Sequence, residues 1–567
     1  MKKYILHNLP SLLIFMIVKV INIGTVLGYS FLIRNLVNLA FKDNALELLH
    51  DYIFVCILYA VTLVIVYCLS SILYTNYFNK CLFLMKEDYA KTLLNSSYEN
   101  VVCKDSSYYI STLCNDTMII RNNFVTALFI MFDEGVTLIG AFICMLILSR
   151  KIALILLIVI VVVSLIPIMF QNMMNKANNK VSEALAKYTS GVKDILGGIE
   201  VIKIFHTERT MEERLTKLNN DVKNSNIQRD YKGTIVSCFA SYVSNLIEMA
   251  LIILTIYYVA NGRMDIGSVS AILTLIRFFF QPIDVFSNQV ACILGSSDIR
   301  EKYMSIIKNY KQKDTKNVFH EVINADNLIA IENLTYSYDG TRKILNNLSL
   351  NIEQGKKYLI FGESGGGKST LLKLIAKMYT EHEGTIKIRG MDYKEVPYDY
   401  ICKNISYSQQ RTYLFQGTIG SNIDLNNRKD EALMNECIKT CQLNEVISKL
   451  DKGIDTVVDE EVNRLSEGEK LRIGLARTLY AGSPLLLLDE ITASLDNKNS
   501  VEIENMILNI QDKTILNICH KFSEEIASKY DQIVVIEHGE IVLMGNYKEI
   551  SKHALFSKYK FGEKVSL

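Results

Sequence analysis

Apolar residues follow two different patterns along the chain, and these patterns divide it into two parts. Before about residue 300 they form six long runs, each long enough to cross roughly 30 Å of hydrocarbon as a helix. The runs lie at about 11–41, 52–74, 124–149, 152–174, 235–260 and 266–290. The remainder has the pattern of a soluble α/β domain. We therefore predict a six-helix membrane domain at 1–305, a polar linker at 306–328 and an α/β domain at 329–567.

The segments between the apolar runs indicate which side of the membrane each faces. Six spans put both chain ends on one side, together with the long loops at 75–123 and 175–234. These loops contain sixteen Lys and Arg residues, whereas the predicted outer turns contain four, namely Lys42, Arg150, Lys151 and Arg263. Positive charge favours the cytoplasmic side, so we expect the loops and the α/β domain in the cytoplasm. Both loops are polar and helix-periodic, which predicts that the spanning helices continue beyond the membrane.

Charged residues inside the spans are costly in lipid and mark either ion pairs between helices or a substrate pathway. At about 1.5 Å per residue, four of them fall near the middle of the membrane. They are Asp133, Glu134, Glu248 and Arg277. Lys19, Arg34 and Asp284 lie closer to the span ends. Both interpretations of the central four stay open; if Arg277 pairs with one acid, the remaining negative charge favours a cationic or amphipathic substrate.

A glycine-rich phosphate-binding loop lies in the α/β part. Tyr358–Phe361 has the pattern of a buried strand and Leu371–Met378 that of a helix, with G-x-x-x-x-G-K-S between them. Glycines let consecutive backbone N–H groups converge on phosphate oxygens, and the helix start adds its positive dipole end. We expect Lys368 to reach the β- and γ-phosphates and Ser369 to bind Mg²⁺. The predicted nucleotide-binding residues here are Gly362, Glu363, Ser364, Gly365, Gly366, Gly367, Lys368, Ser369 and Thr370.

Two acids follow a second buried strand downstream. The apolar run Leu485–Leu488 ends in Asp489 and Glu490. A carboxylate at a strand end holds Mg²⁺ in many nucleotide sites, and a neighbouring carboxylate can polarise an attacking water as a general base. We therefore predict that Asp489 binds metal and that Glu490 is a catalytic base. The alternative is a buried strand that ends in two surface charges.

The run Leu465-Ser-Glu-Gly-Glu-Lys470 resembles the signature LSGGQ of ABC transporters. Ser466 and Gly468 match that signature, whereas Glu467 and Glu469 depart from it. In the family the signature lies over the ATP of the partner chain. The resemblance therefore assigns Leu465, Ser466, Gly468 and Glu469 to the partner's ATP.

Other motifs resemble the same family in their order and spacing. Gln410 resembles the glutamine loop, Asp496 the D-loop and His520 the switch histidine, while Tyr338 lies where the family stacks an aromatic ring on adenine. In the membrane part, Leu196–Glu208 resembles a run in a cytoplasmic loop of the exporters, and Asn115–Asp116 has a similar relation to its own helix. In the family, helices at these loop tips press on the ATP-binding domain. The chain thus resembles ABC transporters of the exporter type over nearly its whole length.

This resemblance implies a half-transporter, with the membrane and ATP-binding domains fused in one chain. It implies ATP and Mg²⁺ as cofactors, with Ser369, Gln410 and Asp489 as metal-binding residues. The catalytic groups it implies are Lys368, Glu490 and His520. It implies a multi-pass protein, most simply of the cell membrane, that exports an amphipathic, lipid-like, peptide or drug-like substrate by alternating access. Import by the same fold, and a membrane ATPase that regulates a channel or partner, stay open.

Dimerisation follows from the resemblance, because each ATP is clamped between the loop of one chain and the signature of the other. We favour a homodimer, since closed two-fold dimers are the commonest assembly. A heterodimer stays open, because the carboxylate of Glu467 could weaken the site completed by the partner's loop.

Composition narrows the remaining possibilities. The net charge of +1 argues against a nucleic-acid partner, which normally leaves a basic excess. The eight histidines are scattered along the sequence, so no histidine-rich metal site can be recognised. Several of the twelve cysteines lie inside apolar runs, and we do not expect a disulfide framework.

Overall fold

A computed structural model describes residues 1–42, 45–309, 327–338, 340–458, 465–493, 495, 497–519 and 523–553 of the chain. The chain divides into two units with separate cores. The first contains Met1–Asn95 and Lys104–Lys311, and the second contains Ser96–Cys103 and Gln312–Leu567. The chain therefore visits the second unit briefly at 96–103 before it returns to the first.

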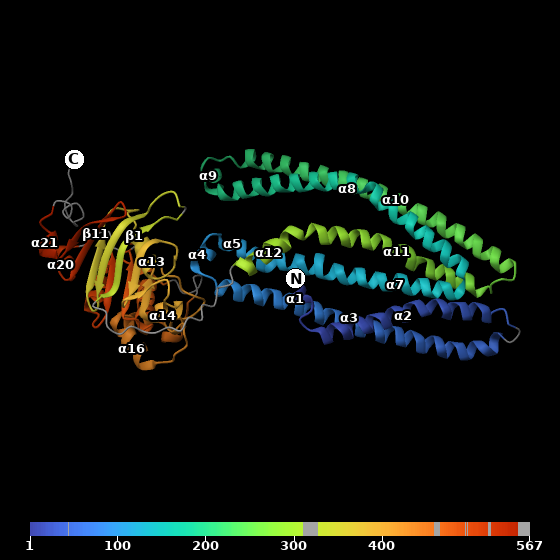
Figure 1. Ribbon diagram of the computed structural model, residues 1–567, viewed down its shortest axis with the longest axis horizontal. Coiled ribbons are helices and arrows are strands. Elements are labelled where there is room, and N and C mark those ends of the chain that lie inside the picture. The colour runs from blue at the N-terminus through green and yellow to red at the C-terminus, as the bar shows by residue number, and fades with distance from the viewer. Residues whose placement is uncertain are drawn as a thin grey trace. The chain divides into compact units, whose positions relative to one another are not determined.

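The first unit is built from long helices, one for each predicted span. In the described residues these are α2 (Leu9–Leu39), α3 (Ala45–Leu94), α7 (Ala127–Leu148), α8 (Arg150–Gly197), α10 (Glu208–Ala260) and α11 (Gly267–Gly295). Helices α3, α8 and α10 contain 50, 48 and 53 residues, far more than the roughly 20 that cross a membrane. These helices are therefore long enough to continue beyond the membrane, as the sequence predicts. Figure 1 shows α8 and α10 lying side by side along most of their length.

Four helical stretches in the described part of the chain are long and apolar enough to span a membrane: Leu9–Leu39, Ala45–Leu94, Ser106–Leu148 and Glu208–Ala260. The third joins α5 (Ser106–Ser111), η1 (Thr112–Asp116), α6 (Thr117–Ile120) and η2 (Arg121–Thr126) to α7, and η1 and η2 are π-helical. The other two predicted spans fall on α8 and α11. Shorter helices are α1 (Lys2–Ile5), α9 (Ile199–Ile204) and α12 (Ser297–Asn309).

The core of the first unit consists of apolar side chains from α2, α7, α8, α10 and α11. Leu27, Met145, Leu156, Leu251 and Phe279 are among its buried members. Close packing of such side chains holds helices together where lipid provides no hydrophobic drive.

Two sheets form the framework of the second unit. The larger has the order β12 (Glu540–Gly545), β11 (Gln532–Glu537), β3 (Lys357–Phe361), β10 (Thr514–Ile518), β9 (Leu485–Asp489), β6 (Ile405–Ser408). All neighbours in it are parallel except β11 and β12. Strands β9 and β10 are buried at every position, which explains their continuous apolar runs. The carboxyl ends of β3, β6, β9 and β10 therefore meet at one edge.

The smaller sheet is antiparallel, with the order β2 (Leu345–Glu353), β1 (Asn327–Tyr336), β4 (Glu383–Ile388), β5 (Met391–Asp392). Strand β2 alternates between buried and more exposed positions, as a strand with one face on the core does. A further pair joins β7 (Gly417–Thr418) to β8 (Val457–Val458).

Helices complete the second unit, and several of them are labelled in Figure 1. They are α13 (Lys368–Ile375), α14 (Tyr398–Asn404), α15 (Ile419–Ile423), α16 (Glu431–Thr440), α17 (Asn444–Ser448), α18 (Glu467–Tyr480), α19 (Asn497–Asn509), α20 (Glu524–Ala527) and α21 (Tyr547–Ile550). The segment Ser96–Cys103, which follows α3 in the sequence but belongs to the second unit, contains α4 (Tyr98–Val102). Its Tyr98 packs against the core that contains Leu371 and Ile386.

Candidate nucleotide-binding site

The predicted site residues gather at the edge where the parallel strands end. Strand β3 ends at Phe361 and runs into the glycine-rich loop, and β9 ends at Asp489. Strand β6 ends at Ser408, two residues before Gln410, and β10 ends at Ile518. Ligands of open α/β sheets bind at this edge. Two predicted site residues, Asp496 and His520, lie outside the described residues.

The glycine-rich loop requires glycine for steric reasons. A Cβ at Gly362, whose φ is 148°, would lie 1.9 Å from the carbonyl oxygen of Ile536. At Gly367, with φ 95°, it would lie 2.8 Å from the carbonyl oxygen of Ile344. The loop is therefore pressed against neighbouring backbone and turns directly into α13, so the positive end of the helix dipole lies at the loop.

Lys368 is buried at the start of α13, and its ammonium folds over the loop. Its Nζ donates hydrogen bonds to the carbonyl oxygens of Gly362, at 3.0 Å, and Glu363, at 2.8 Å. Burial lowers the pKa of Lys368, while the nearby charges of Glu490 and Asp489 act in the opposite direction. The ammonium thus lies among the groups expected to contact the phosphates.

Asp489 connects the loop to the end of β9. Its Oδ1 accepts a hydrogen bond from the Ser369 hydroxyl at 2.7 Å, and its Oδ2 accepts one from the Tyr407 hydroxyl at 2.7 Å. Two predicted Mg²⁺ residues, 120 positions apart, thus present oxygen donors side by side. Oxygen donors of this kind suit Mg²⁺. Among the described residues no group of three or more His, Cys, Asp and Glu side chains is placed to hold a metal.

Glu490 has a backbone conformation that is rare for a residue with a side chain. Its φ is 52°, in the left-handed region. Its N–H donates to the carbonyl oxygen of Ile518 at 3.2 Å, which ties it to the end of β10. Its Oε2 accepts a hydrogen bond from Gln410 Nε2 at 3.3 Å. The predicted base and the predicted glutamine loop are therefore neighbours.

Tyr338 belongs to a group of aromatic rings beside the loop. Its hydroxyl is 3.0 Å from the Thr370 hydroxyl oxygen, and its side chain is about half-exposed. The ring centroid lies 5.2 Å from that of Tyr379, which in turn lies 5.9 Å from that of Tyr98 in α4. Burial raises the pKa of Tyr379 to about 12, with Tyr338 and Tyr98 adding to the effect. A series of ring contacts thus runs from α4 to the site.

Three tyrosines of this region were missed by sequence reasoning: Tyr98, Tyr379 and Tyr407. None of them lies inside a recognised motif. The nearest available signal is position: Tyr407 is three residues before Gln410, and Tyr379 directly follows the helix predicted after the loop.

The signature run begins α18. Ser466 is the N-cap, and its hydroxyl accepts a hydrogen bond from the N–H of Glu469 at 3.3 Å. The Glu469 carboxylate in turn accepts one from the N–H of Ser466 at 2.8 Å, which completes a capping box. Glu467 is exposed and pairs with Lys470 at 3.1 Å. Leu465 packs on the core, and Gly468 lies close to the side chain of Leu495.

Two of the predicted pathway residues of the first unit have polar partners on other helices. Asp133 pairs with Lys19 at 3.1 Å. Lys19, which residue counting places closer to a span end, is thus the base beside one of the central acids. Glu134 accepts a hydrogen bond from Gln281 Nε2 at 3.3 Å. Glu248 is half-buried and Arg277 is exposed.

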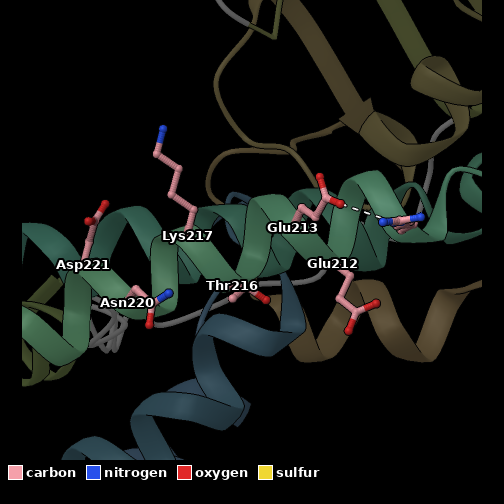
Figure 2. Close-up of a pocket in the computed structure, with 7 residues that line it drawn as sticks. Glu212, Glu213, Thr216, Lys217, Asn220 and Asp221 are labelled. Carbon is pink, nitrogen blue, oxygen red and sulfur yellow. Dashed lines mark ion pairs between the residues drawn. The ribbon is translucent and has the colours of Figure 1, made fainter.

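A recess along α10 contains none of the predicted site residues. Figure 2 shows the side chains of this recess projecting from one helix in several directions. They are Arg209, Glu212, Glu213, Thr216, Lys217, Asn220 and Asp221. Arg209 pairs with Glu213 at 3.4 Å along the helix, a spacing typical of a solvated face. We interpret this recess as exposed helix surface.

Comparisons with known proteins agree with this geometry. Residues 12–283 match the model of the ABC transporter transmembrane region, and residues 345–493 match the ABC transporter model. The chain belongs to the ABC transporter family. An ATP-dependent lipid A-core flippase of Pasteurella multocida is 25% identical over 500 residues, which cover 87% of this chain and 84% of the flippase. An ATM1-type heavy metal exporter of Novosphingobium aromaticivorans is 28% identical over 330 residues, 58% of this chain and 54% of the exporter.

The fold is shared with a bacterial Atm1-family ABC exporter solved with ATP bound. The TM-score is 0.78, with 21% identity, over 97% of each chain. The predicted fold class is thereby confirmed. The protein is a half-transporter, a multi-pass membrane protein with a cytoplasmic ATP-binding domain, and it couples ATP hydrolysis to export. The alternatives of import and of partner regulation are not favoured by these relatives.

Proposed function

We propose that ATP is hydrolysed at the edge formed by the glycine-rich loop, Asp489 and Glu490. The observation that carries this proposal is the 2.7 Å contact between Ser369 and Asp489, which joins the loop to the strand end. The loop N–H groups and Lys368 hold the phosphates, and Tyr338 stacks on adenine. Glu490 takes the proton of the attacking water. Gln410 orients this water, and His520 orients the γ-phosphate.

Mg²⁺ fits the oxygen set of Ser369, Asp489 and Gln410. Bound there, the ion neutralises charge on the β- and γ-phosphate oxygens. The chain's own contribution is orientation: the hydroxyls of Ser369 and Tyr407 fix the two oxygens of the Asp489 carboxylate.

The test separates binding from turnover. Glu490→Gln in the full chain in lipid should keep ATP binding and lose about 100-fold or more in turnover, because only the base is removed. Lys368→Ala should lose ATP binding instead, because its ammonium contacts the phosphates. Full ATPase activity in the Glu490→Gln variant would contradict the assignment.

Two chains complete each ATP site in this proposal, and both sites turn over. The capped start of α18 offers the hydroxyl of Ser466 to the partner's ATP. Lys470 pairs with Glu467 and balances its negative charge. The Glu467 carboxylate then repels a triphosphate less, and this supports a homodimer. The segment 196–205, which we call the α9 loop, runs from the end of α8 through α9. Its exposed apolar side chains, Leu196, Ile204 and Phe205, provide a surface that docks on the partner's ATP-binding domain.

ATPase activity of this chain purified alone in lipid tests the homodimer. Robust activity that disappears with Ser466→Arg supports it. An inactive chain that a second half-transporter restores would instead establish a heterodimer.

A cationic amphipathic molecule is the cargo class that the first unit favours. Lys19 pairs with Asp133, while Glu134 has a neutral amide as its described partner, so Glu134 is the acid of this group available to a cationic substrate. Glu248 adds a further half-buried acid. Efflux of an organic cation from vesicles of known orientation should fall with Glu134→Gln and remain with Glu213→Gln, a cytoplasmic control. Equal efflux of the cation and its neutral isostere would contradict this cargo class.

A further inference from the structure

A buried carboxylate, Glu504, lies at the centre of a polar cluster in the second unit. Glu504 belongs to α19 and is only 4% exposed. Its Oε2 accepts hydrogen bonds from Asn517 Nδ2 and from the Tyr530 hydroxyl, each at 2.9 Å. Its Oε1 accepts from the Cys519 thiol at 2.7 Å and from the Thr492 hydroxyl at 3.4 Å. We call these five residues the Glu504 cluster.

Both carboxyl oxygens of Glu504 act as acceptors in the cluster. A carboxylate only accepts, so the thiol and both hydroxyls each direct one proton toward it. Asn517 also donates to the Tyr530 oxygen at 2.7 Å, which leaves the tyrosine proton for Glu504. Burial, together with the Glu504 charge, raises the pKa values of Cys519 and Tyr530 well above their ordinary range. Both groups therefore remain protonated donors, and four donors compensate for the buried charge.

This arrangement is costly for a strand that is otherwise apolar. Asn517 is completely buried in β10, and its Oδ1 has no partner in the described part of the chain. A buried acceptor without a hydrogen-bond partner destabilises the fold. An aliphatic side chain at this position would avoid that cost, as at the neighbouring Leu516 and Ile518. Stability alone thus does not explain the cluster.

Its members hold the segments that carry the reacting groups. Thr492 is two residues after Glu490, and Cys519 directly precedes His520, which lies outside the described residues. Ser500 of α19 also donates to the carbonyl oxygen of Thr492, at 3.3 Å. The left-handed conformation of Glu490 is strained for a residue with a side chain and persists only where the surroundings hold it.

We propose that Glu504 is a positioning residue for ATP hydrolysis. It clamps the turn after Glu490 to the end of β10, and this keeps the Glu490 backbone left-handed and its carboxylate directed at the attacking water. The inference rests on the proposed role of Glu490 as base.

The first test uses Glu504→Leu in the full chain in lipid. We expect kcat to fall by about 10- to 100-fold, because a misplaced catalytic group costs that much, while KM for ATP stays within about twofold. Glu504→Gln should keep most activity: its carbonyl accepts from Asn517 and Tyr530, and its amide donates to the oxygen and sulfur of Thr492 and Cys519. Rescue by this neutral, shape-matched variant separates hydrogen bonding from charge.

Milder variants distinguish a loss of positioning from misfolding of the chain. Cys519→Ser keeps a donor to Glu504 and should be active, whereas Cys519→Ala removes it and should lower kcat. Ile507→Ala is the control for general destabilisation, because Ile507 is completely buried on the same helix. We expect it to lower the unfolding temperature without lowering kcat.

Two results would overturn the positioning role. One is that Ile507→Ala and Glu504→Leu, compared at an equal loss of unfolding temperature, lose kcat to the same extent. The other is normal turnover in Glu504→Leu while Glu490→Gln is inactive. The proposed function fails in a different way, by full turnover in Glu490→Gln itself.

Discussion

Replacing Tyr407 with Phe would remove one hydroxyl from the nucleotide-binding edge and keep the ring. That hydroxyl donates to Asp489 Oδ2 at 2.7 Å, while Ser369 occupies Oδ1. Burial and the charge of Asp489 raise the pKa of Tyr407 above its ordinary value, so the phenol stays a donor at physiological pH. The variant therefore releases one of the two bonds that orient the carboxylate.

The size of the effect follows from the kind of bond. A hydrogen bond to a charged group contributes about 1.5–3 kcal/mol, and each 1.4 kcal/mol is roughly tenfold in an equilibrium. If the bond serves to orient Asp489, the Mg²⁺ concentration for half-maximal ATPase activity should rise by about 10- to 100-fold. Activity at saturating Mg²⁺ should change much less, because Glu490 is untouched.

The assay is ATPase activity of the full chain in lipid, titrated with Mg²⁺ at fixed ATP. Tyr413→Phe is the matched control, since Tyr413 is 69% exposed in the same segment. An unchanged Mg²⁺ midpoint together with a lower unfolding temperature would show that the bond only stabilises the fold. No change in either quantity would refute the reasoning altogether.

Three further predictions concern the signature, the ring contacts and the membrane ion pair. Glu467→Gly should change ATPase activity by less than about twofold, because Lys470 already balances the carboxylate; a large gain would favour a heterodimer. Tyr379→Ala should reduce stimulation of ATPase activity by substrate while ATP binding persists, because the ring joins α4 to the site; Tyr379→Phe is the control. Lys19→Met should lower the unfolding temperature in lipid more than Lys19→Met combined with Asp133→Leu does, because the single change leaves the Asp133 carboxylate without its ion-pair partner. The reverse order would contradict the pairing.

Local motifs in the sequence predict much of the fold and of the nucleotide-binding edge. The strand predicted at Tyr358–Phe361 lies within β3, and the apolar run that ends in Asp489 is β9. Helix α13 begins at Lys368, earlier than predicted, because the helix starts inside the glycine-rich motif. Such features depend on neighbours in sequence, so periodicity and spacing suffice to find them.

Contacts made across the fold cannot be predicted in this way. Tyr407 and Asp489 are 82 residues apart and meet only because β6 and β9 are parallel neighbours. Counting residues places Lys19 near a span end, yet it pairs with Asp133 on a different helix. Distance from a span end says nothing about which helix packs opposite. The partners of a buried charge therefore depend on tertiary packing.

The apolar α9 loop has a consequence for how the cell handles the protein. Leu196, Ile204 and Phe205 are 66%, 71% and 70% exposed in the single chain. A chain that has not met its partner displays these side chains to the cytosol, where chaperones and proteases recognise such surfaces. If they dock on the partner's ATP-binding domain as proposed, assembly hides them, and pairing would lengthen the life of each chain. The abundance of the transporter in the membrane would then be limited by the rate at which chains find one another.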